Sequence, residues 1–300
     1  MHRLFLLNGK LHPAWRAAGY FVVLLPGLIT LDGLLGLIWF AAQPLPAADS
    51  AALVEHLAAI TAQPAFLLAS ALTNLSWALL LAGLGLRWLD RAPLLSLGWG
   101  RTNMGRDVLL GLALGCASMA LVFLVFRLLG WVRVDGWAVL PRLDEGFTLT
   151  GALIAAAAFE EIMFRGYPLR TLLEWRGWPL SLVVTSTLFG LVHLGNPSVS
   201  GLAVFNIALA GAAFGLTLKV AGRLWLPIAY HFAWNFAQGP LLGLSVSGLN
   251  FPTLLRTTLT GPALWTGGAF GPEGGLVVTL LLLASIGLLW AWDRRAAAAA

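Results

Sequence analysis

Eight apolar runs, each close to the length of a membrane span, divide this sequence. They fall at residues 19–42, 64–86, 107–129, 147–165, 179–195, 200–218, 225–247 and 275–292. About 20 residues of α-helix cross the hydrocarbon core of a bilayer. Because backbone groups find no water there, such runs must form helices that satisfy their own hydrogen bonds. The sequence therefore predicts an all-α, polytopic membrane protein with about eight transmembrane helices in a lipid bilayer.

The composition also indicates a lipid environment. Hydrophobic residues make up 59% of the 300 residues and charged residues 10%, whereas soluble domains carry about 25% charged residues. The net charge of +5 does not indicate nucleic acid, because Arg and Lys in a membrane protein mainly report its topology. The single cysteine, Cys116, excludes a disulfide within the chain and a CxxC metal site.

Basic residues predict the orientation of the chain. With the N-terminus in the cytoplasm, 14 of the 18 Lys and Arg residues fall in inner segments. Two of those residues are Arg3 and Arg101, and the four outer ones are Arg127, Arg133, Arg142 and Arg256. This asymmetry follows the positive-inside rule and predicts that both termini are cytoplasmic. We expect an integral protein of a bacterial inner membrane, whose first apolar run is retained and not cleaved as a signal peptide.

The chain is expected to form one helical membrane domain over residues 1–295, followed by a low-complexity tail at 296–300. Its core, at about 147–247, carries the unusual polar residues. Three segments are expected to be loops: 43–63, 130–148 and 262–275.

Two adjacent carboxylates, Glu160 and Glu161, end an apolar run that includes four consecutive alanines. An ionisable side chain at membrane depth costs at least about 2.5–3.5 kcal/mol, so two in a row need a local reason. One interpretation is a helix that has reached the interface, with Glu161 paired to Arg165 at i,i+4. The other is a functional site.

The spacing of a helical hairpin favours a site for the first glutamate. The segment Arg176–Pro179 is a turn signal, since glycine ends helices and proline begins them. Glu160 lies 16–17 residues before its centre and His193 the same number after it, so both are about 25 Å from the turn in an antiparallel pair. Glu160 and His193 should therefore lie at the same height in the helix pair. Glu161, about 100° further around the helix, is expected to point elsewhere and pair with Arg165.

The seventh run adds His231 and Asn235, which share a helix face at i,i+4. A lone histidine in an apolar helix is more often a satisfied core residue than a ligand. Together with Glu160 and His193, however, these groups are costly in lipid and satisfy one another only in a shared wet cavity. The sequence therefore predicts a polar intramembrane cavity lined by these four residues.

Two kinds of hydrolytic site fit these groups. A carboxylate beside an imidazole can deprotonate water, while a second imidazole and an amide can donate hydrogen bonds to a developing oxyanion. Alternatively, Glu160, His193 and His231 could hold a hydrolytic Zn²⁺ or another divalent metal ion. Spacing alone does not separate the two.

Three motifs follow one another on successive apolar runs: Glu160-Glu161-x-x-x-Arg165, Phe189-x-x-x-His193 and His231-x-x-x-Asn235. Together they resemble the motifs of the CPBP family of intramembrane proteases, which contains CAAX prenyl endopeptidases and bacteriocin-processing or immunity proteins. The resemblance covers about residues 150–240 and implies an intramembrane endopeptidase. Its substrate would be a peptide or protein in the membrane, prenylated or not.

By motif position, Glu160 would be the water-activating base, assisted by His193, and His231 and Asn235 would form the oxyanion site. The supporting residues would be Glu161, Arg165 and Phe189. Family members have been described both as metalloproteases and as metal-independent glutamate proteases. We favour the second type, with no cofactor, because the Asn235 amide suits oxyanion binding better than metal ligation.

Two other functions remain open. A non-catalytic scaffold or immunity protein would keep the motifs as a polar cluster, although their intact state counts against it. A proton-coupled transporter would use buried Glu and His residues as a relay, although the lack of an internal repeat counts against that.

Two further features concern the sixth run. Gly211-x-x-x-Gly215 predicts close packing against a neighbouring helix. Asn206 is expected either to line the cavity or to bond to another helix.

Overall fold

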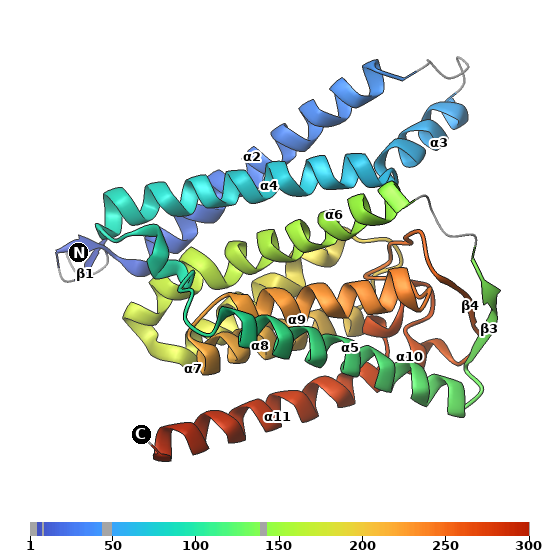
Figure 1. Ribbon diagram of the computed structural model, residues 1–300. Coiled ribbons are helices and arrows are strands. Elements are labelled where there is room, and N and C mark those ends of the chain that lie inside the picture. Colours follow the sequence, from blue (N-terminus) through green and yellow to red (C-terminus); the bar gives the residue numbers. More distant parts are fainter. Residues whose placement is uncertain (1–4, 8, 44–49, 139–142, 300) are drawn as a thin grey trace.

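The computed structural model of the chain describes residues 5–7, 9–43, 50–138 and 143–299. Two basic residues used above to predict the orientation, Arg3 and Arg142, lie outside these ranges, as do parts of the expected loops. Within them the chain is largely helical and carries only two small two-stranded sheets. The predicted all-α fold is confirmed (Figure 1).

The helices are α2 (Pro13–Ala41), α3 (Ser50–Thr61), α4 (Pro64–Leu84), α5 (Met104–Leu128), α6 (Leu143–Glu161), α7 (Tyr167–Leu191), α8 (Gly201–Ala221), α9 (Trp225–Phe236), α10 (Ala263–Thr266) and α11 (Leu276–Ala299). Shorter helical segments are η1 (Gly85–Asp90), η2 (Leu94–Leu97), η3 (Ile162–Gly166), η4 (Val192–Gly195), η5 (Ala237–Leu241), η6 (Gly268–Phe270) and η7 (Pro272–Gly274). The strands are β1 (Leu6–Leu7), β2 (Lys10–Leu11), β3 (Val132–Trp137) and β4 (Leu255–Leu259).

Each of the eight apolar runs contains a helix, and six segments of the described chain are long and apolar enough to cross a membrane. One of these segments, Leu143–Gly195, contains both α6 and α7. The chain turns within it at Gly177, whose φ of 64° and ψ of −171° are not helical. The seventh run is helical only to Leu241, because Gly243 adopts a φ of 70° shortly afterwards. This is the architecture of a multi-pass integral membrane protein.

The helices pack so that α9 and α8 lie at the centre of the bundle. In Figure 1 they run between α6 and α11, and α5 packs along α9. The close contact of α5 with α9 depends on Gly111 and Gly115, because a Cβ on either would lie 2.6 Å from a backbone carbonyl oxygen of α9. Small residues permit such close contacts between membrane helices, and here they fix the helix that carries His231 and Asn235.

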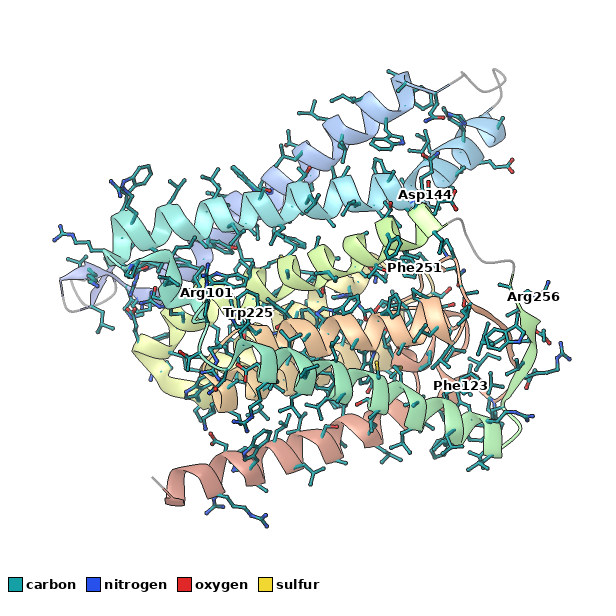
Figure 2. The ribbon with its side chains drawn as sticks, viewed as in Figure 1. Arg101, Phe123, Asp144, Trp225, Phe251 and Arg256 are labelled. Atoms are coloured by element: carbon teal, nitrogen blue, oxygen red, sulfur yellow. The ribbon has the colours of Figure 1, made fainter. Side chains whose placement is uncertain are left out.

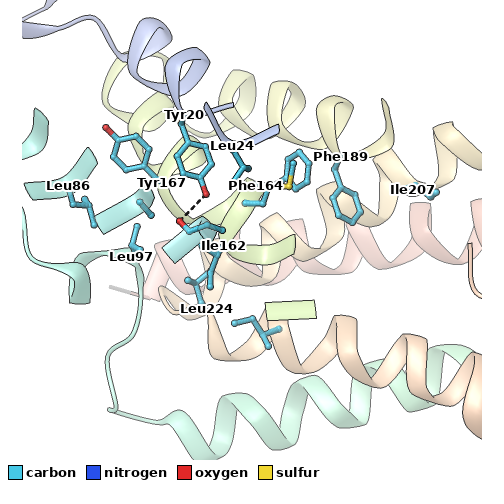
Figure 3. Close-up of a cluster of buried hydrophobic side chains, with 14 of the residues drawn as sticks. Tyr20, Leu24, Leu86, Leu97, Ile162, Phe164, Tyr167, Phe189, Ile207 and Leu224 are labelled. Atoms are coloured by element: carbon cyan, nitrogen blue, oxygen red, sulfur yellow. Dashed lines mark hydrogen bonds between the residues drawn. The ribbon is translucent and has the colours of Figure 1, made fainter. Parts of the chain in front are cut away.

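A buried apolar cluster packs between the helices at one end of the bundle. It includes Tyr20, Leu86, Ile162 and Leu224 (Figure 3). The hydroxyl group of Tyr20 donates a hydrogen bond to the carbonyl oxygen of Ala78 at 3.3 Å. The same cluster contains Phe164 and Phe189, so it also packs against the polar site described below.

Ion pairs join segments on this side of the protein. Arg16 of α2 is buried and pairs with Asp90 of η1, and it contacts Glu174 of α7 at 2.5 Å. Arg223, in the turn between α8 and α9, donates to Asp107 at 2.6 Å. That hydrogen bond raises the pKa of Arg223 above its usual value. Arg101 lies at this end of the bundle and Arg256 at the other (Figure 2).

All three expected loops contain regular structure. The segment 262–275 carries the short helices α10, η6 and η7. The segment 43–63 carries α3, and the segment 130–148 carries β3, which pairs antiparallel with β4. The two strands are more than 100 residues apart in the sequence, so no local pattern signals their pairing. Thr258 and Arg133 both donate to the Asp135 carboxylate at 2.6 Å, and these hydrogen bonds lower its pKa.

Candidate active site

Glu160 lies where α6, α7 and α9 converge. Its Oε2 atom is 4.0 Å from Nε2 of His193 and 3.8 Å from Nε2 of His231. Glu160 is in the last turn of α6, His193 follows α7 in η4, and His231 is in the middle of α9. The three motifs are thus brought together around one carboxylate oxygen. That oxygen is buried and has no hydrogen-bond partner among the described residues.

The orientation of His193 is set by the backbone of its own helix. Its Nδ1 atom lies 2.7 Å from the carbonyl oxygen of Phe189. A carbonyl oxygen only accepts hydrogen bonds, so Nδ1 carries the proton. In the neutral ring, the lone pair on Nε2 then faces Glu160. The ring of Phe189 packs edge-on against the imidazole at a centroid distance of 5.1 Å.

His231 lies between the two adjacent glutamates. Its Nδ1 atom is 3.0 Å from Oε1 of Glu161, while Nε2 faces Glu160. Phe214 of α8 stacks on the imidazole, with a centroid distance of 4.8 Å and an interplanar angle of 16°. The carboxylate and the phenyl ring fix both the tautomer and the plane of this histidine.

The expectation for Glu161 is only partly confirmed. Its pair with Arg165 is present at 2.9 Å, but the same Oε1 atom also binds His231. Because α9 packs against α6, one imidazole lies in the groove between the two glutamate side chains. Glu160 and Glu161, about 100° apart on their helix, reach opposite nitrogens of that ring.

Arg165 is enclosed behind the two glutamates. It lies in the π-helical segment η3, a feature frequent at functional sites. Its Nη2 atom donates to the carbonyl oxygen of Gly211 at 2.9 Å, and its guanidinium lies 4.3 Å from the centroid of the Phe189 ring. A Cβ on Gly211 would be 2.9 Å from Nη2. The glycine therefore allows α8 to approach the arginine, as a small residue at a helix contact does.

A cavity of about 380 Å³ opens beside these groups. Glu160, His193, His231 and Asn235 all line it, whereas Glu161 and Arg165 lie in the wall behind. Phe189 also lines the cavity. The far end is lined by residues from the segment after α9, one of which is Phe251 (Figure 2). The carboxylate, the imidazoles and the amide thus share one cavity, which is the arrangement that water-mediated hydrolysis requires.

Residues 143–237 match the family model described as type II CAAX prenyl endopeptidase Rce1-like. This segment is similar to an Rce1-like domain. The match runs from the start of α6 to the first residue of η5 and contains all three motifs. It confirms the resemblance to the CPBP proteases and supports a membrane protease with a peptide or protein substrate. No curated protein and no solved structure matched the chain.

Beyond the matched Rce1-like segment, the structure adds a carboxylate that the sequence interpretation placed only in a loop. Glu273 of η7 lines the same cavity. Its Oε1 atom accepts from the indole of Trp234 at 3.2 Å, and its Oε2 atom accepts from the Ser247 amide at 2.6 Å and hydroxyl at 2.7 Å. Glu273 is the one acidic residue between α9 and α11, and that isolation is the only signal the sequence offered.

Asn206 does not line the cavity. It donates to the carbonyl oxygens of Glu273 at 2.8 Å and Gly275 at 2.9 Å, and Thr279 donates to its side-chain oxygen at 2.7 Å. Of the two roles expected for Asn206, the structure shows a bond to neighbouring segments. This contact fixes the position of η7 beside α8.

The metal alternative stays a prediction. Glu160, His193 and His231 approach one another, with nitrogen–oxygen separations of 3.8 and 4.0 Å. In the described parts of the chain, however, no group of three or more His, Cys, Asp and Glu side chains is arranged to hold a metal ion. The reaction proposed below therefore includes no metal ion.

Proposed function

We propose that this protein is a membrane-embedded endopeptidase that hydrolyses a peptide bond with a water molecule activated by Glu160. The observation that carries the proposal is the environment of Glu160 Oε2. This oxygen is buried without a hydrogen-bond partner among the described residues, yet it faces Nε2 of both His193 and His231. Separations of 3.8–4.0 Å are too long for direct hydrogen bonds but suit a bridging water.

In the proposed reaction, Glu160 takes one proton from the water as the water oxygen bonds to the substrate carbonyl carbon. The lone pair on Nε2 of His193 accepts a hydrogen bond from the same water and orients it. The carbonyl oxygen becomes an oxyanion. When the C–N bond breaks, the departing nitrogen takes the proton from Glu160, and the products are a carboxylic acid and an amine.

His231 and Asn235 are placed to stabilise the oxyanion. The Asn235 amide is a hydrogen-bond donor in the cavity wall. His231 donates from Nε2 only when both ring nitrogens are protonated, a form that the carboxylate of Glu161 stabilises at Nδ1. Glu161 and Arg165 are then positioning residues, because they act through His231.

We further propose that the protein lies in the inner membrane of a bacterium with both termini in the cytoplasm. The support is the distribution of Arg and Lys along the chain.

The test compares Glu160→Gln with Glu55→Gln, a change of the same type at an exposed residue of α3. Both variants and the wild type are reconstituted in liposomes with a mixed peptide library, and cleavage is followed by mass spectrometry. We expect Glu160→Gln to lose about 10²–10⁴-fold in rate and Glu55→Gln to match the wild type. Cleavage by a folded Glu160→Gln variant at the wild-type rate would contradict the proposal.

A further inference from the structure

Two carboxylates line the cavity. Its charged or titratable lining residues are Glu160, Glu273, His193 and His231, and neither Lys nor Arg lines it. Arg165 is near, but it is fully buried and bound to Glu161 and Gly211. A cationic group of the substrate would therefore find two carboxylates in this wall.

Glu273 is held by neutral donors only. The indole of Trp234 and the backbone amide and hydroxyl of Ser247 supply three hydrogen bonds. None of the ion pairs among the described residues includes Glu273. Its side chain is thus fixed in place while its charge is left without a counterion, although the residue is only 9% exposed.

The position of Glu273 is close to the reacting groups. Its partner Trp234 is adjacent in sequence to Asn235 and one helical turn after His231. Asn196 donates to the carbonyl oxygen of Ser247 at 2.9 Å and lines the same end of the cavity. Because Glu273 is largely buried, the lower local dielectric strengthens its interaction with a cation that reaches it.

We propose that Glu273 forms a subsite for a cationic group of the substrate, a Lys or Arg side chain within a few residues of the scissile bond. The proposal rests on the proposed endopeptidase function and narrows its substrate class to peptide segments that are basic near the cleaved bond.

The first measurement needs only the wild-type protein. Internally quenched peptides of one sequence carry Lys, Gln or Glu at each position flanking the cleaved bond. We expect kcat/KM for Lys to exceed that for Gln by at least about tenfold at one position. We expect kcat/KM for Glu to be lower than that for Gln at the same position. No preference for Lys at any position overturns the subsite.

The second measurement assigns the preference to Glu273. In Glu273→Gln the ratio of kcat/KM for Lys to that for Gln should fall to about one, because the amide carries no charge. Glu145→Gln, at an exposed acid in the first turn of α6, should keep the wild-type ratio. An equal loss for all peptides in Glu273→Gln, with the ratio unchanged, would assign the residue a structural role and overturn the proposal.

The two proposals fail in different ways. If peptides are cleaved and Glu160→Gln abolishes cleavage while Lys is not preferred, the subsite is wrong and the endopeptidase stands. If Glu160→Gln cleaves every peptide at the wild-type rate, or the wild type cleaves none, both proposals fall.

Discussion

Glu161 Oε1 lies 3.0 Å from Nδ1 of His231, and the same oxygen lies 2.9 Å from Nη1 of Arg165. The side chains of Glu161 and Arg165 have no exposed surface, and His231 is also buried. The second glutamate of the motif therefore neutralises a buried arginine and fixes a histidine at once. A buried charge that loses its partner is strongly destabilising, whereas an apolar replacement of the whole pair often is not.

Substitutions of Glu161 and Arg165 should affect stability and cleavage activity in different ways. We expect Glu161→Leu to lower the free energy of unfolding by about 3–5 kcal/mol, because it leaves the Arg165 guanidinium buried without a counterion. Glu161→Leu/Arg165→Met should recover most of that loss. Both variants should lose at least about 100-fold in cleavage rate, because His231 has lost the carboxylate at Nδ1.

Thermal unfolding in detergent and peptide cleavage measure the two effects. If the double variant is less stable than Glu161→Leu, the pair is not the reason for the loss. If the double variant regains cleavage as well as stability, the carboxylate at Nδ1 has no part in the reaction.

Gly211 provides a test of the contact between α8 and Arg165. In Gly211→Ala the new methyl group would lie 2.9 Å from Arg165 Nη2 and 3.2 Å from the Cα of Ser186. We expect a loss of about 1–3 kcal/mol from the strain and a lower cleavage rate, since the displaced guanidinium shifts Glu161.

The matched control is Gly287→Ala in α11, where an added Cβ meets nothing within 4 Å. It should leave cleavage unchanged and change stability by no more than about 1 kcal/mol. Equal effects of the two substitutions would show that contact with Arg165 is not what Gly211 provides.

Much of this arrangement could be predicted from the sequence, because its signals are local. Apolar runs of spanning length give the helices, and the turn at Gly177 gives the shared height of Glu160 and His193. The position of Glu161 could not be predicted in this way. It depends on where α9 packs against α6, and helical spacing within one segment does not contain that information.

Packing between distant segments also explains why sequence analysis gave no role in the site to several other residues. Glu273 reaches the cavity because Asn206, 67 residues earlier, holds the backbone of η7. Phe214 contributes by stacking on His231 from a different helix. The pairing of β3 with β4 likewise joins distant segments. Each contact is decided by tertiary packing, which overrides local pattern.

Removing metal ions distinguishes metal-dependent hydrolysis from metal-independent hydrolysis. We expect purified enzyme treated with EDTA or 1,10-phenanthroline, then freed of chelator, to keep its cleavage rate, and elemental analysis to find no stoichiometric zinc. The reason is that no group of three or more ligand side chains in the described chain is arranged to hold a metal ion. Loss of cleavage that is restored by added Zn²⁺ would contradict this expectation and return Glu160, His193 and His231 to the role of ligands.

The β3–β4 pair should respond to acid through Asp135. Hydrogen bonds from Thr258 and Arg133 lower its folded-state pKa. A group of this kind contributes stability that is fully present above its unfolded pKa of about 3.9 and is lost as the pH falls through the folded value. We expect the strand amides to exchange more slowly with solvent deuterium in the wild type than in Asp135→Asn at pH 6. That difference should shrink as the pH falls below about 3.9 and should disappear once the pH is below the folded-state pKa as well. A difference that persists unchanged in acid would contradict the assignment.

The orientation in the membrane can be tested with single cysteines, because Cys116 is the only native one. In a Cys116→Ser background, Leu95→Cys places a thiol in η2, near the end of the bundle that carries Arg101 (Figure 2). Leu264→Cys places one in α10, near β4 at the other end (Figure 1). The native side chains are 65% and 60% exposed, so both thiols should be reactive.

If both termini are cytoplasmic, a membrane-impermeant maleimide added to intact bacterial cells should label Leu264→Cys alone. In permeabilised cells, both variants should be labelled. Labelling of Leu95→Cys alone in intact cells would reverse the orientation.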